Sequence, residues 1–460
     1  MYLHADMQKV IVQIQSTIAP DFLLRWPSLA VGDCLMKLAL DLCTCAAGGV
    51  LLILTSCTEP NSDSASDSAA ASTSSTTGDD TTTDGDTTST TGEPTTSTTT
   101  TTTTTTGPEE PEVYGEWVKR EPEGAICSDG SQFKFFVNFA EDSDNLLVYF
   151  EPGGACWDFE TCSGNTPLGA ANPNGIPDTH MDKYGVLSPI LSRVDPQNPS
   201  RDWNLVFIPY CTGDVHTGNR VMTYDDPEGV REPLVYHHNG HDNVSAVIDY
   251  LGGQFPQIDR MMLTGCSAGG TGSIINYHFF RERLQVERAY LLNDSGPIFP
   301  SSGFSAPLHQ KIRSSWDVDP ILETIPEGNL LADDFGKLNS ILANLYPEDR
   351  LTTAYFKRDF NYSRYSYESF YPNPSKEQTL DYWAQDTTLL TAQYDQFDNL
   401  AYYIPYWRGI NDSHCTGIIT YEGTEIQEMD MDLSLFIDEL LDDSAPLTSY
   451  EESDQPGEDL

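Results

Sequence analysis

An α/β fold, with a mostly parallel sheet and flanking helices, is predicted by two apolar runs that each end in a glycine-rich turn. Residues 146–150 (LLVYF) form a continuous apolar run, as expected of a strand that is buried on both faces. Residues 260–263 predict a second strand, and the residues from Ala268 to about Arg283 predict the helix that follows it. A strand, a turn and a helix in succession are typical of α/β proteins with parallel sheets.

The turn between that second strand and its helix holds a serine between two glycines, in the pattern Gly265-Cys266-Ser267-Ala268-Gly269. The turn is strained and the helix passes close to the strand, so a Cβ atom at either glycine would clash. The serine hydroxyl then stands clear of the sheet at the N-terminus of the helix, where free backbone N–H groups favour a developing oxyanion. This pattern predicts a nucleophile elbow of the α/β-hydrolase fold, with Ser267 as the nucleophile. Alone, it is equally typical of an ordinary Gly/Ser turn.

A glycine-rich loop follows the first predicted strand, with the sequence EPGGACW at residues 151–157. Such a loop can direct backbone N–H groups at a substrate oxygen. We therefore predict an oxyanion hole formed by Gly154 and Ala155 together with Ala268 of the elbow. Trp157 is a candidate wall of the substrate pocket, with ordinary packing as the alternative.

The acid and the base are expected after the serine, because the chain order in this fold is nucleophile, acid, histidine. Residues 388–393 (TLLTAQ) predict another buried strand, which ends at Tyr394-Asp395. Of the nine histidines, His414 alone lies beyond Asp395. The sequence therefore predicts Asp395 as the acid and His414 as the base.

Two other carboxylates compete with Asp395 for the role of the acid. Asp294 follows a plausible strand at residues 289–292, and some α/β-hydrolases draw their acid from that earlier strand. Asp398 is the third candidate. If Asp395 is the acid, Asp294 is expected either to shape the substrate pocket or to cap a turn at a strand end.

Several short segments together resemble the pectinacetylesterase/Notum family of α/β-hydrolase serine carboxylesterases, over about residues 113–425. The segments are CSDGS (127–131), EPGGACW (151–157), IPYCTGDV (208–215), GCSAGGTG (265–272), NDSG (293–296), YD (394–395) and HC (414–415). The resemblance implies a triad of Ser267, Asp395 and His414, ester hydrolysis through an acyl-enzyme, and no cofactor or metal. It leaves the acyl group open, since plant members resemble pectin deacetylases and the animal member removes a fatty acyl group from a signalling protein.

Six cysteines fall in the predicted domain: Cys127, Cys156, Cys162, Cys211, Cys266 and Cys415. In a protein exported across the inner membrane, such cysteines can be oxidised to disulfides. A bridge between Cys156 and Cys162 would hold the oxyanion loop in place, and the resemblance implies a second bridge between Cys127 and Cys211. Cys266 and Cys415 flank the serine and the histidine, and their pairing is left open because strand-end geometry could aim them apart. Zinc is the rival interpretation, but no C-x-x-C or supporting histidine spacing favours it.

Other histidines and a long aromatic segment are secondary candidates. His216 could line the pocket or pack in the core. His237, His238 and His241 could suggest a metal, but the start of a helix at residues 242–251 is the favoured interpretation. Residues 301–375 are rich in aromatic side chains and are expected to form a cap over the active site, with a plain helical side layer as the alternative.

The N-terminal part of the chain predicts export and lipid anchoring. Residues 51–57 (LLILTSC) are an apolar run that ends in two small residues and a cysteine, which is a bacterial lipobox. A signal peptide is therefore predicted at 36–57, with Cys57 as the lipidated terminus of the mature protein, and residues 1–35 are interpreted as an overextended gene start. A transmembrane anchor is the alternative, which the short and interrupted apolar run disfavours.

The 460 residues are enough for one large domain with extensions. Residues 58–112 are rich in Thr, Ser and Asp and cannot bury enough apolar surface to fold, so they predict a linker. The hydrolase domain is expected at 113–445 and a disordered acidic tail at 446–460.

The net charge of −46 comes from 70 acidic and 24 basic residues, and beyond Gly107 the chain holds 58 acidic and 21 basic ones. The net charge of this part of the chain is therefore about −37. Such a negative surface excludes nucleic-acid binding and suits a saline habitat. We therefore predict a monomeric carboxylesterase, secreted across the inner membrane of a bacterium and anchored to the cell envelope by its N-terminal lipid. Its expected substrate is an acyl ester, most simply an acetyl ester on a polysaccharide. A fatty-acyl esterase and a non-catalytic glycan-binding lipoprotein are the alternatives.

Overall fold

A computed structural model describes residues 113–164, 169–184, 188–409, 413–417, 421 and 423–455. The expectations for residues 1–35, 36–57 and 58–112 lie outside these residues, so lipid anchoring at Cys57 stays a prediction. Among the helices of the described part, none combines the length and the apolar character that crossing a bilayer requires.

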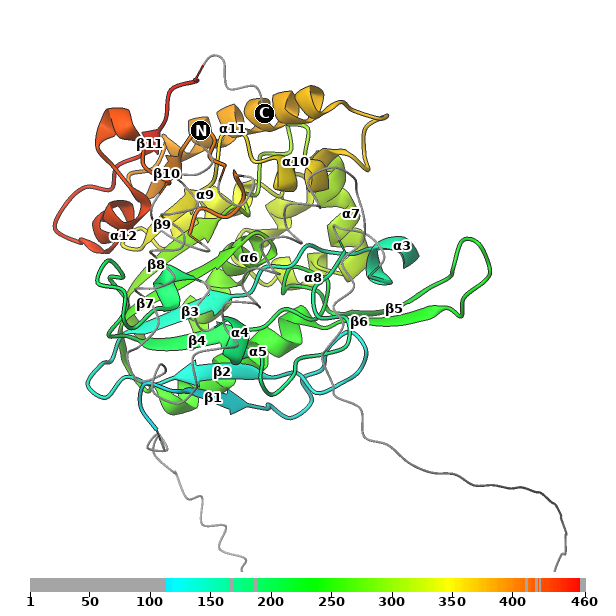
Figure 1. Ribbon diagram of the computed structural model, residues 1–460, viewed down its shortest axis with the longest axis horizontal. Helices are drawn as coiled ribbons and strands as arrows, with labels where there is room; N and C mark the ends of the chain where they lie inside the picture. Colours follow the sequence, from blue (N-terminus) through cyan, green and yellow to red (C-terminus); the bar gives the residue numbers. More distant parts are fainter. Residues whose placement is uncertain are drawn as a thin grey trace, which may run out of the picture. The chain divides into compact units, whose positions relative to one another are not determined.

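A nine-stranded sheet runs through the centre of the domain (Figure 1). Its strands, in spatial order, are β1 (Trp117–Arg120), β2 (Phe135–Asn138), β4 (Asn204–Ile208), β3 (Leu146–Phe150), β7 (Ile258–Cys266), β8 (Val286–Asp294), β9 (Arg350–Ala354), β10 (Leu400–Ile404) and β11 (Tyr450–Glu451). Strand β2 pairs antiparallel with both β1 and β4, and every pairing from β4 to β11 is parallel. The antiparallel hairpin of β5 (Arg220–Tyr224) and β6 (Leu234–His238) extends away from this sheet.

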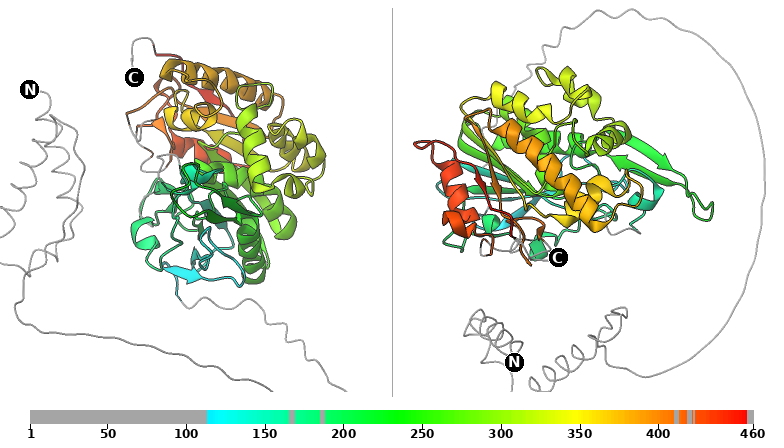
Figure 2. Two further views of the ribbon diagram at one scale, coloured as in Figure 1. Left: turned by 90° about the vertical axis from the view of Figure 1, so that its right-hand side faces the viewer. Right: turned by 90° about the horizontal axis from the view of Figure 1, so that it is seen from above.

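Helices flank the sheet, and α5, α6, α9 and α11 form a continuous layer (Figure 2). The α-helices are α3 (Phe159–Cys162), α4 (Met181–Tyr184), α5 (Gly240–Gln254), α6 (Ala268–Arg283), α7 (Ala306–Trp316), α8 (Asp319–Leu322), α9 (Lys337–Leu345), α10 (Phe360–Tyr367), α11 (Lys376–Tyr394) and α12 (Leu433–Leu441), with 3₁₀ turns η3 (Pro189–Leu191), η4 (Gly328–Ala332) and η6 (Gln427–Met429). This arrangement confirms the predicted α/β-hydrolase fold, because the elbow serine lies directly between β7 and α6.

The two strands and the helix on which the prediction rests are confirmed. All five residues of β3 are buried, as a strand between two parallel neighbours requires. Helix α6 is buried at every position from Ala268 to Phe280, so it is the central helix of its layer. The predicted helix at 242–251 lies within α5, and the predicted strand at 289–292 lies within β8.

The strand predicted at 388–393 is wrong, because these residues belong to the long helix α11. Ser375 starts that helix with a capping box: its hydroxyl accepts from the Gln378 backbone N–H, and the Gln378 side chain accepts from the Ser375 N–H. The buried residues recur at helical spacing along it, at Leu380, Trp383, Thr387, Leu390 and Tyr394. A short apolar run does not by itself distinguish a buried strand from one face of a helix.

The expectation of a cap over residues 301–375 is correct for only part of that segment. Strand β9 lies inside it and pairs with β8 and β10 in the middle of the sheet. Trp316 and Tyr355 are fully buried in the main core. Helix α10 is the part that reaches the candidate active site, as described below.

The boundary predicted at residue 446 is also wrong, because residues 446–455 continue the domain. Strand β11 pairs with β10 at the edge of the sheet. Glu452 is 1% exposed, forms an ion pair with Arg408 and accepts a hydrogen bond from the Tyr406 backbone N–H at 2.6 Å. The segment is acidic and therefore resembles a disordered tail in the sequence, but the buried carboxylate of Glu452 holds it against the sheet.

Candidate active site

Ser267 occupies a strained turn between β7 and α6. Its φ of 55° and ψ of −120° are unusual for a residue with a side chain, as expected at a nucleophile elbow. The predicted role of the two glycines is confirmed: a Cβ at Gly269 would collide with the Phe150 carbonyl of β3, and one at Gly265 would lie 2.6 Å from the same oxygen. The Ser267 N–H donates to the Asp294 carbonyl at 2.8 Å, which ties the turn to the end of β8.

His414 lies in the loop that follows β10, and its ring is paired with a buried carboxylate. Its Nδ1 is 2.7 Å from Oδ2 of Asp359, and the Asp359 side chain is fully buried. The other oxygen of the same carboxylate, Oδ1, accepts the Tyr362 backbone N–H at 2.9 Å and so caps the N-terminus of α10. Asp359 thus fixes both the histidine ring and the helix that begins beside it.

The prediction of Asp395 as the partner of His414 is therefore wrong. Asp395 is exposed at the C-terminal end of α11, where Tyr402 donates a hydrogen bond to it at 3.3 Å. Asp398 is likewise exposed. Asp294 lies at the end of β8 and is buried, but its carboxylate binds the backbone beyond the histidine rather than the imidazole.

The surroundings of His414 raise its pKa above the ordinary value. Burial alone would lower this pKa, but the negative charge of Asp359 and its hydrogen bond to the ring more than offset that effect, and the charge of Asp294 adds to them. The protonated imidazole is consequently stabilised, as a general base needs when it accepts a proton.

One cavity joins the serine, the histidine and the two flanking loops. Its volume is about 240 Å³, and its lining comprises Gly154, Val215, Ser267, Ala268, Asn361, Tyr362, Tyr365 and His414. Two of the predicted oxyanion residues, Gly154 and Ala268, thus lie at the cavity with Ser267. Ala155 is buried and is not part of this lining. Asn361, Tyr362 and Tyr365 all come from α10, which lies within the aromatic segment 301–375 that the sequence predicts as a cap over the active site.

The oxyanion loop is held on several sides. The predicted Cys156–Cys162 disulfide is present and joins the loop to α3. The Cys156 N–H donates to the Gly213 carbonyl at 2.9 Å, and the Gly153 carbonyl accepts from the Ala171 N–H at 2.8 Å. At the start of the loop, the buried carboxylate of Glu151 accepts the Tyr210 N–H at 2.7 Å. The second expected disulfide, Cys127–Cys211, is also present.

His216 and Trp157 stand behind the cavity rather than in its lining. His216 is 2% exposed, and its Nε2 is 2.9 Å from the Glu151 carbonyl oxygen, which supports the base of the oxyanion loop. Burial lowers the pKa of His216 to about 4, so this ring is neutral and structural. Trp157 packs against Tyr365 with a ring separation of 5.5 Å, so it supports one wall of the cavity.

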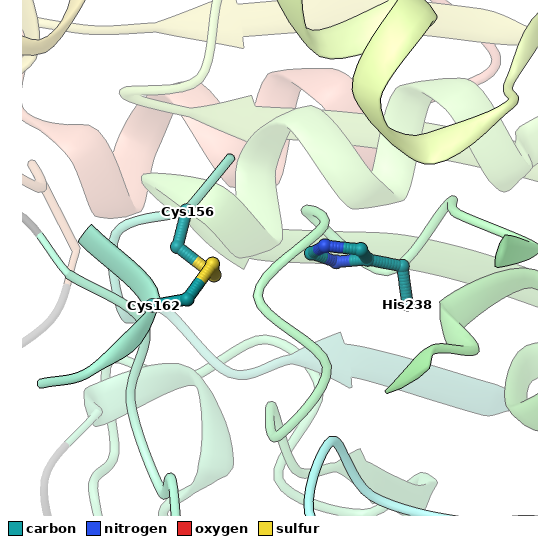
Figure 3. Close-up of side chains that lie close together, drawn as sticks. All are labelled: Cys156, Cys162 and His238. Atoms are coloured by element: carbon teal, nitrogen blue, oxygen red, sulfur yellow. A yellow bond between two sulfur atoms is a disulfide. The ribbon is translucent and has the colours of Figure 1, made fainter. Parts of the chain in front are cut away.

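The three histidines near the start of α5 do not form a cluster of their own. His238 lies beside the Cys156–Cys162 bridge instead (Figure 3). Both sulfurs are bonded to each other, and both His238 nitrogens have partners: Nδ1 is 3.0 Å from the Thr212 carbonyl and Nε2 is 2.8 Å from the Tyr224 hydroxyl. A metal at this position would have to displace all of these bonds, so the group is a structural support of the loop.

The pairing left open by the sequence is settled by the third disulfide, Cys266–Cys415. These residues directly precede Ser267 and directly follow His414. The bridge therefore links the elbow and the histidine loop, which are 149 positions apart at the bonded cysteines.

The sheet order, the elbow and the Ser267, His414 and Asp359 arrangement define an α/β-hydrolase. Residues 109–325 match the family model described as Pectinacetylesterase. The matched segment includes the oxyanion loop and Ser267, whereas Asp359 and His414 lie beyond it.

Similar proteins come from plants and animals. The chain is 34% identical to pectin acetylesterase 4 of Arabidopsis thaliana over 175 residues, which are 36% of this chain and 39% of that protein. It is 33% identical to the palmitoleoyl-protein carboxylesterase notum2 of Xenopus laevis over 156 residues, which are 33% of this chain and 29% of the relative. The chain thus spans about two fifths or less of the length of these two relatives. A solved structure of the Wnt deacylase Notum from Drosophila superimposes with a TM-score of 0.48 at 19% identity, covering 70% of this chain and 92% of that one.

Proposed function

We propose that the protein is a serine carboxylic ester hydrolase that uses Ser267, His414 and Asp359. The observation that supports this most directly is the meeting of the elbow serine and a carboxylate-bound histidine at one cavity. A glycan-binding protein has no need of such a strained serine beside such a histidine. The match of residues 109–325 to the pectinacetylesterase family model supports the same reaction class.

The geometry assigns each group a part in the reaction. Asp359 accepts the Nδ1 proton of His414, which leaves Nε2 as the basic nitrogen. As the Ser267 oxygen attacks the ester carbonyl carbon, Nε2 takes the hydroxyl proton and then gives it to the departing alcohol, which leaves an acyl-enzyme. Water repeats these steps and releases the acid. Backbone N–H groups of Gly154 and Ala268 are the proposed donors to the carbonyl oxygen.

The lining of the cavity favours a short acyl group. Among its eight lining residues, only Val215 and Ala268 carry aliphatic side chains, so a long acyl chain would find little aliphatic surface there. Tyr362 and Tyr365 close the wall, and Tyr362 is fixed by a 2.7 Å hydrogen bond between its hydroxyl and that of Thr271. An acetyl ester therefore suits this site better than a fatty-acyl ester.

A chain-length series tests the acyl preference. With p-nitrophenyl esters from acetate to palmitate, we expect kcat/KM to be highest for the shortest acyl groups and at least tenfold lower at palmitate, because the longer chain must displace Tyr362 or Tyr365. Replacement of Tyr365 by alanine is the matched control, since it should extend the accepted length. Faster hydrolysis of the palmitoyl ester by the unaltered protein would instead favour a fatty-acyl esterase.

The negative charge of the protein indicates which kind of polysaccharide carries the ester. The acidic domain should repel a polyanion such as pectin, and the three arginines nearest the motifs in sequence are engaged elsewhere: Arg220 with the Ser314 carbonyl, Arg260 with Tyr290, and Arg408 with Glu452. We propose a neutral acetylated polysaccharide as the substrate class.

Acetate release measured across ionic strength checks this proposal. Acetylated xylan should be deacetylated faster than acetylated pectin at low salt, and the difference should narrow as salt screens the repulsion. Faster release from pectin at low salt would show a cationic groove and would restore pectin as the substrate.

A further inference from the structure

We propose that Asp294 is a positioning residue, which holds the His414 loop and the Ser267 elbow to one point at the end of β8. This inference rests on the proposed esterase function. Asp294 does not touch the imidazole; it acts through the residues that follow it. From the sequence alone, this carboxylate is predicted only as an acid, a pocket residue or a turn cap.

The side chain of Asp294 receives four hydrogen bonds although it is only 5% exposed. Its Oδ1 accepts from the Thr416 backbone N–H at 2.8 Å, the Thr416 hydroxyl at 2.8 Å and the Ser295 hydroxyl at 2.9 Å. Its Oδ2 accepts from the Gly417 N–H at 2.9 Å. Three of these four donors belong to Thr416 and Gly417, which lie two and three positions after His414. The Asp294 carboxylate therefore anchors the histidine loop.

The backbone of the same residue holds the nucleophile. The Asp294 carbonyl accepts the Ser267 N–H at 2.8 Å, while the neighbouring Ser295 hydroxyl accepts the Cys415 N–H at 3.0 Å. The nucleophile Ser267 and the loop that carries the base His414 are therefore both hydrogen-bonded to residues at the end of β8. The Cys266–Cys415 disulfide makes a second, covalent connection between the same two segments.

The loop needs such support because its backbone is strained on both sides of the histidine. Ser413 has a φ of 56° and Cys415 a φ of 64°, and neither is a glycine. Residues with side chains stay in this left-handed region only where surrounding contacts determine them. The bonds from Asp294 to Thr416 and Gly417 are contacts of this kind.

The negative charge of Asp294 makes the proposal testable through the pKa of His414. A residue that only supported the fold would leave this pKa unchanged. Among the residues that the structure describes, the charged groups that act on His414 are Asp359, at the start of α10, and Asp294, at the end of β8; both raise the pKa of the imidazole. The ring of Tyr362 also lies beside the imidazole, at 6.4 Å between centroids. Burial raises the pKa of the Asp294 carboxyl group above its ordinary value, and the hydrogen bonds from Gly417, Thr416 and Ser295 oppose that effect.

Asp294→Asn is the first test. Its amide nitrogen cannot accept from the Gly417 N–H, so we expect kcat to fall by about 10- to 100-fold through misplacement of His414, with KM little changed. The acid limb of the kcat/KM profile should also move to lower pH, because the loss of a negative charge lowers the pKa of His414. The rate at which a fluorophosphonate labels Ser267 should fall in parallel.

A matched pair at Thr416 decides the question if Asp294→Asn does not fold. Thr416→Val removes one hydroxyl donor with little change of shape and should lower kcat by about three- to tenfold, whereas Thr416→Ser keeps the donor and should restore it. An active parent protein with unchanged kcat and pH profile in Asp294→Asn and Thr416→Val would overturn the inference. An inactive parent that takes no label would instead overturn the proposed function itself.

Discussion

Ser267→Ala and His414→Ala are each expected to lower kcat by a factor on the order of 10⁶, and the double variant by no more than either single one. The serine hydroxyl is a weak nucleophile until the imidazole takes its proton, so removal of either member disables the pair. Residual turnover should come from the backbone donors near Gly154 and Ala268.

The measurement is single-substrate kinetics on p-nitrophenyl acetate, combined with fluorophosphonate labelling of Ser267. Ser314→Ala and His237→Ala are suitable controls, because Ser314 is exposed on α7 and His237 lies on the β5–β6 hairpin, away from the cavity. Both controls should retain full activity and labelling. Substantial turnover in Ser267→Ala, or labelling at another serine, would place the nucleophile elsewhere.

The elbow could be predicted from the sequence because its requirements are local. Gly265 and Gly269 are needed where a helix passes against the carbonyl of Phe150, and this close approach leaves a pattern within five residues. The adjacent strand β3 is buried on both faces, and its apolar run shows this directly. Each of these signals is complete without knowledge of the rest of the chain.

The strand that leads toward the acid carries no such signal. Strand β9 has the sequence RLTTA, and both of its threonines are buried. Their hydroxyls donate to strand carbonyls, Thr352 to Leu291 and Thr353 to Asn293, so their burial leaves no hydroxyl unpaired. Because threonine is polar, this sequence lacks the apolar run that is typical of a buried strand. The apolar run at 388–393 predicts a strand instead, although the capping box at Ser375 marks a helix there.

The contacts of the histidine loop could not be predicted for a different reason. Asp294 and Thr416, and the cysteines Cys266 and Cys415, meet across more than a hundred residues of chain. Periodicity and turn chemistry describe neighbours in sequence, and they say nothing about which loops converge at the end of a sheet. The sequence supplied the residue types at the site but left their pairing undetermined.

Asp359→Asn should separate the two candidate acids, with a loss in kcat of about 10⁴-fold. The amide oxygen can replace Oδ1 as acceptor of the Tyr362 N–H, so α10 keeps its cap and the fold should survive. The amide nitrogen then faces Nδ1 of His414 and donates to it, which places the imidazole proton on Nε2. In that tautomer the nitrogen needed as the base can no longer accept the serine proton.

Asp395→Asn is the matched control, since Asp395 is exposed at the end of α11 and should leave kcat within about twofold of the parent, as surface substitutions usually do. Circular dichroism and the melting temperature should show that both variants are folded. A large loss in Asp395→Asn with little change in Asp359→Asn would reverse the assignment. It would also mean that α11 moves when substrate binds, because Asp395 could not otherwise reach the ring that Asp359 holds at 2.7 Å.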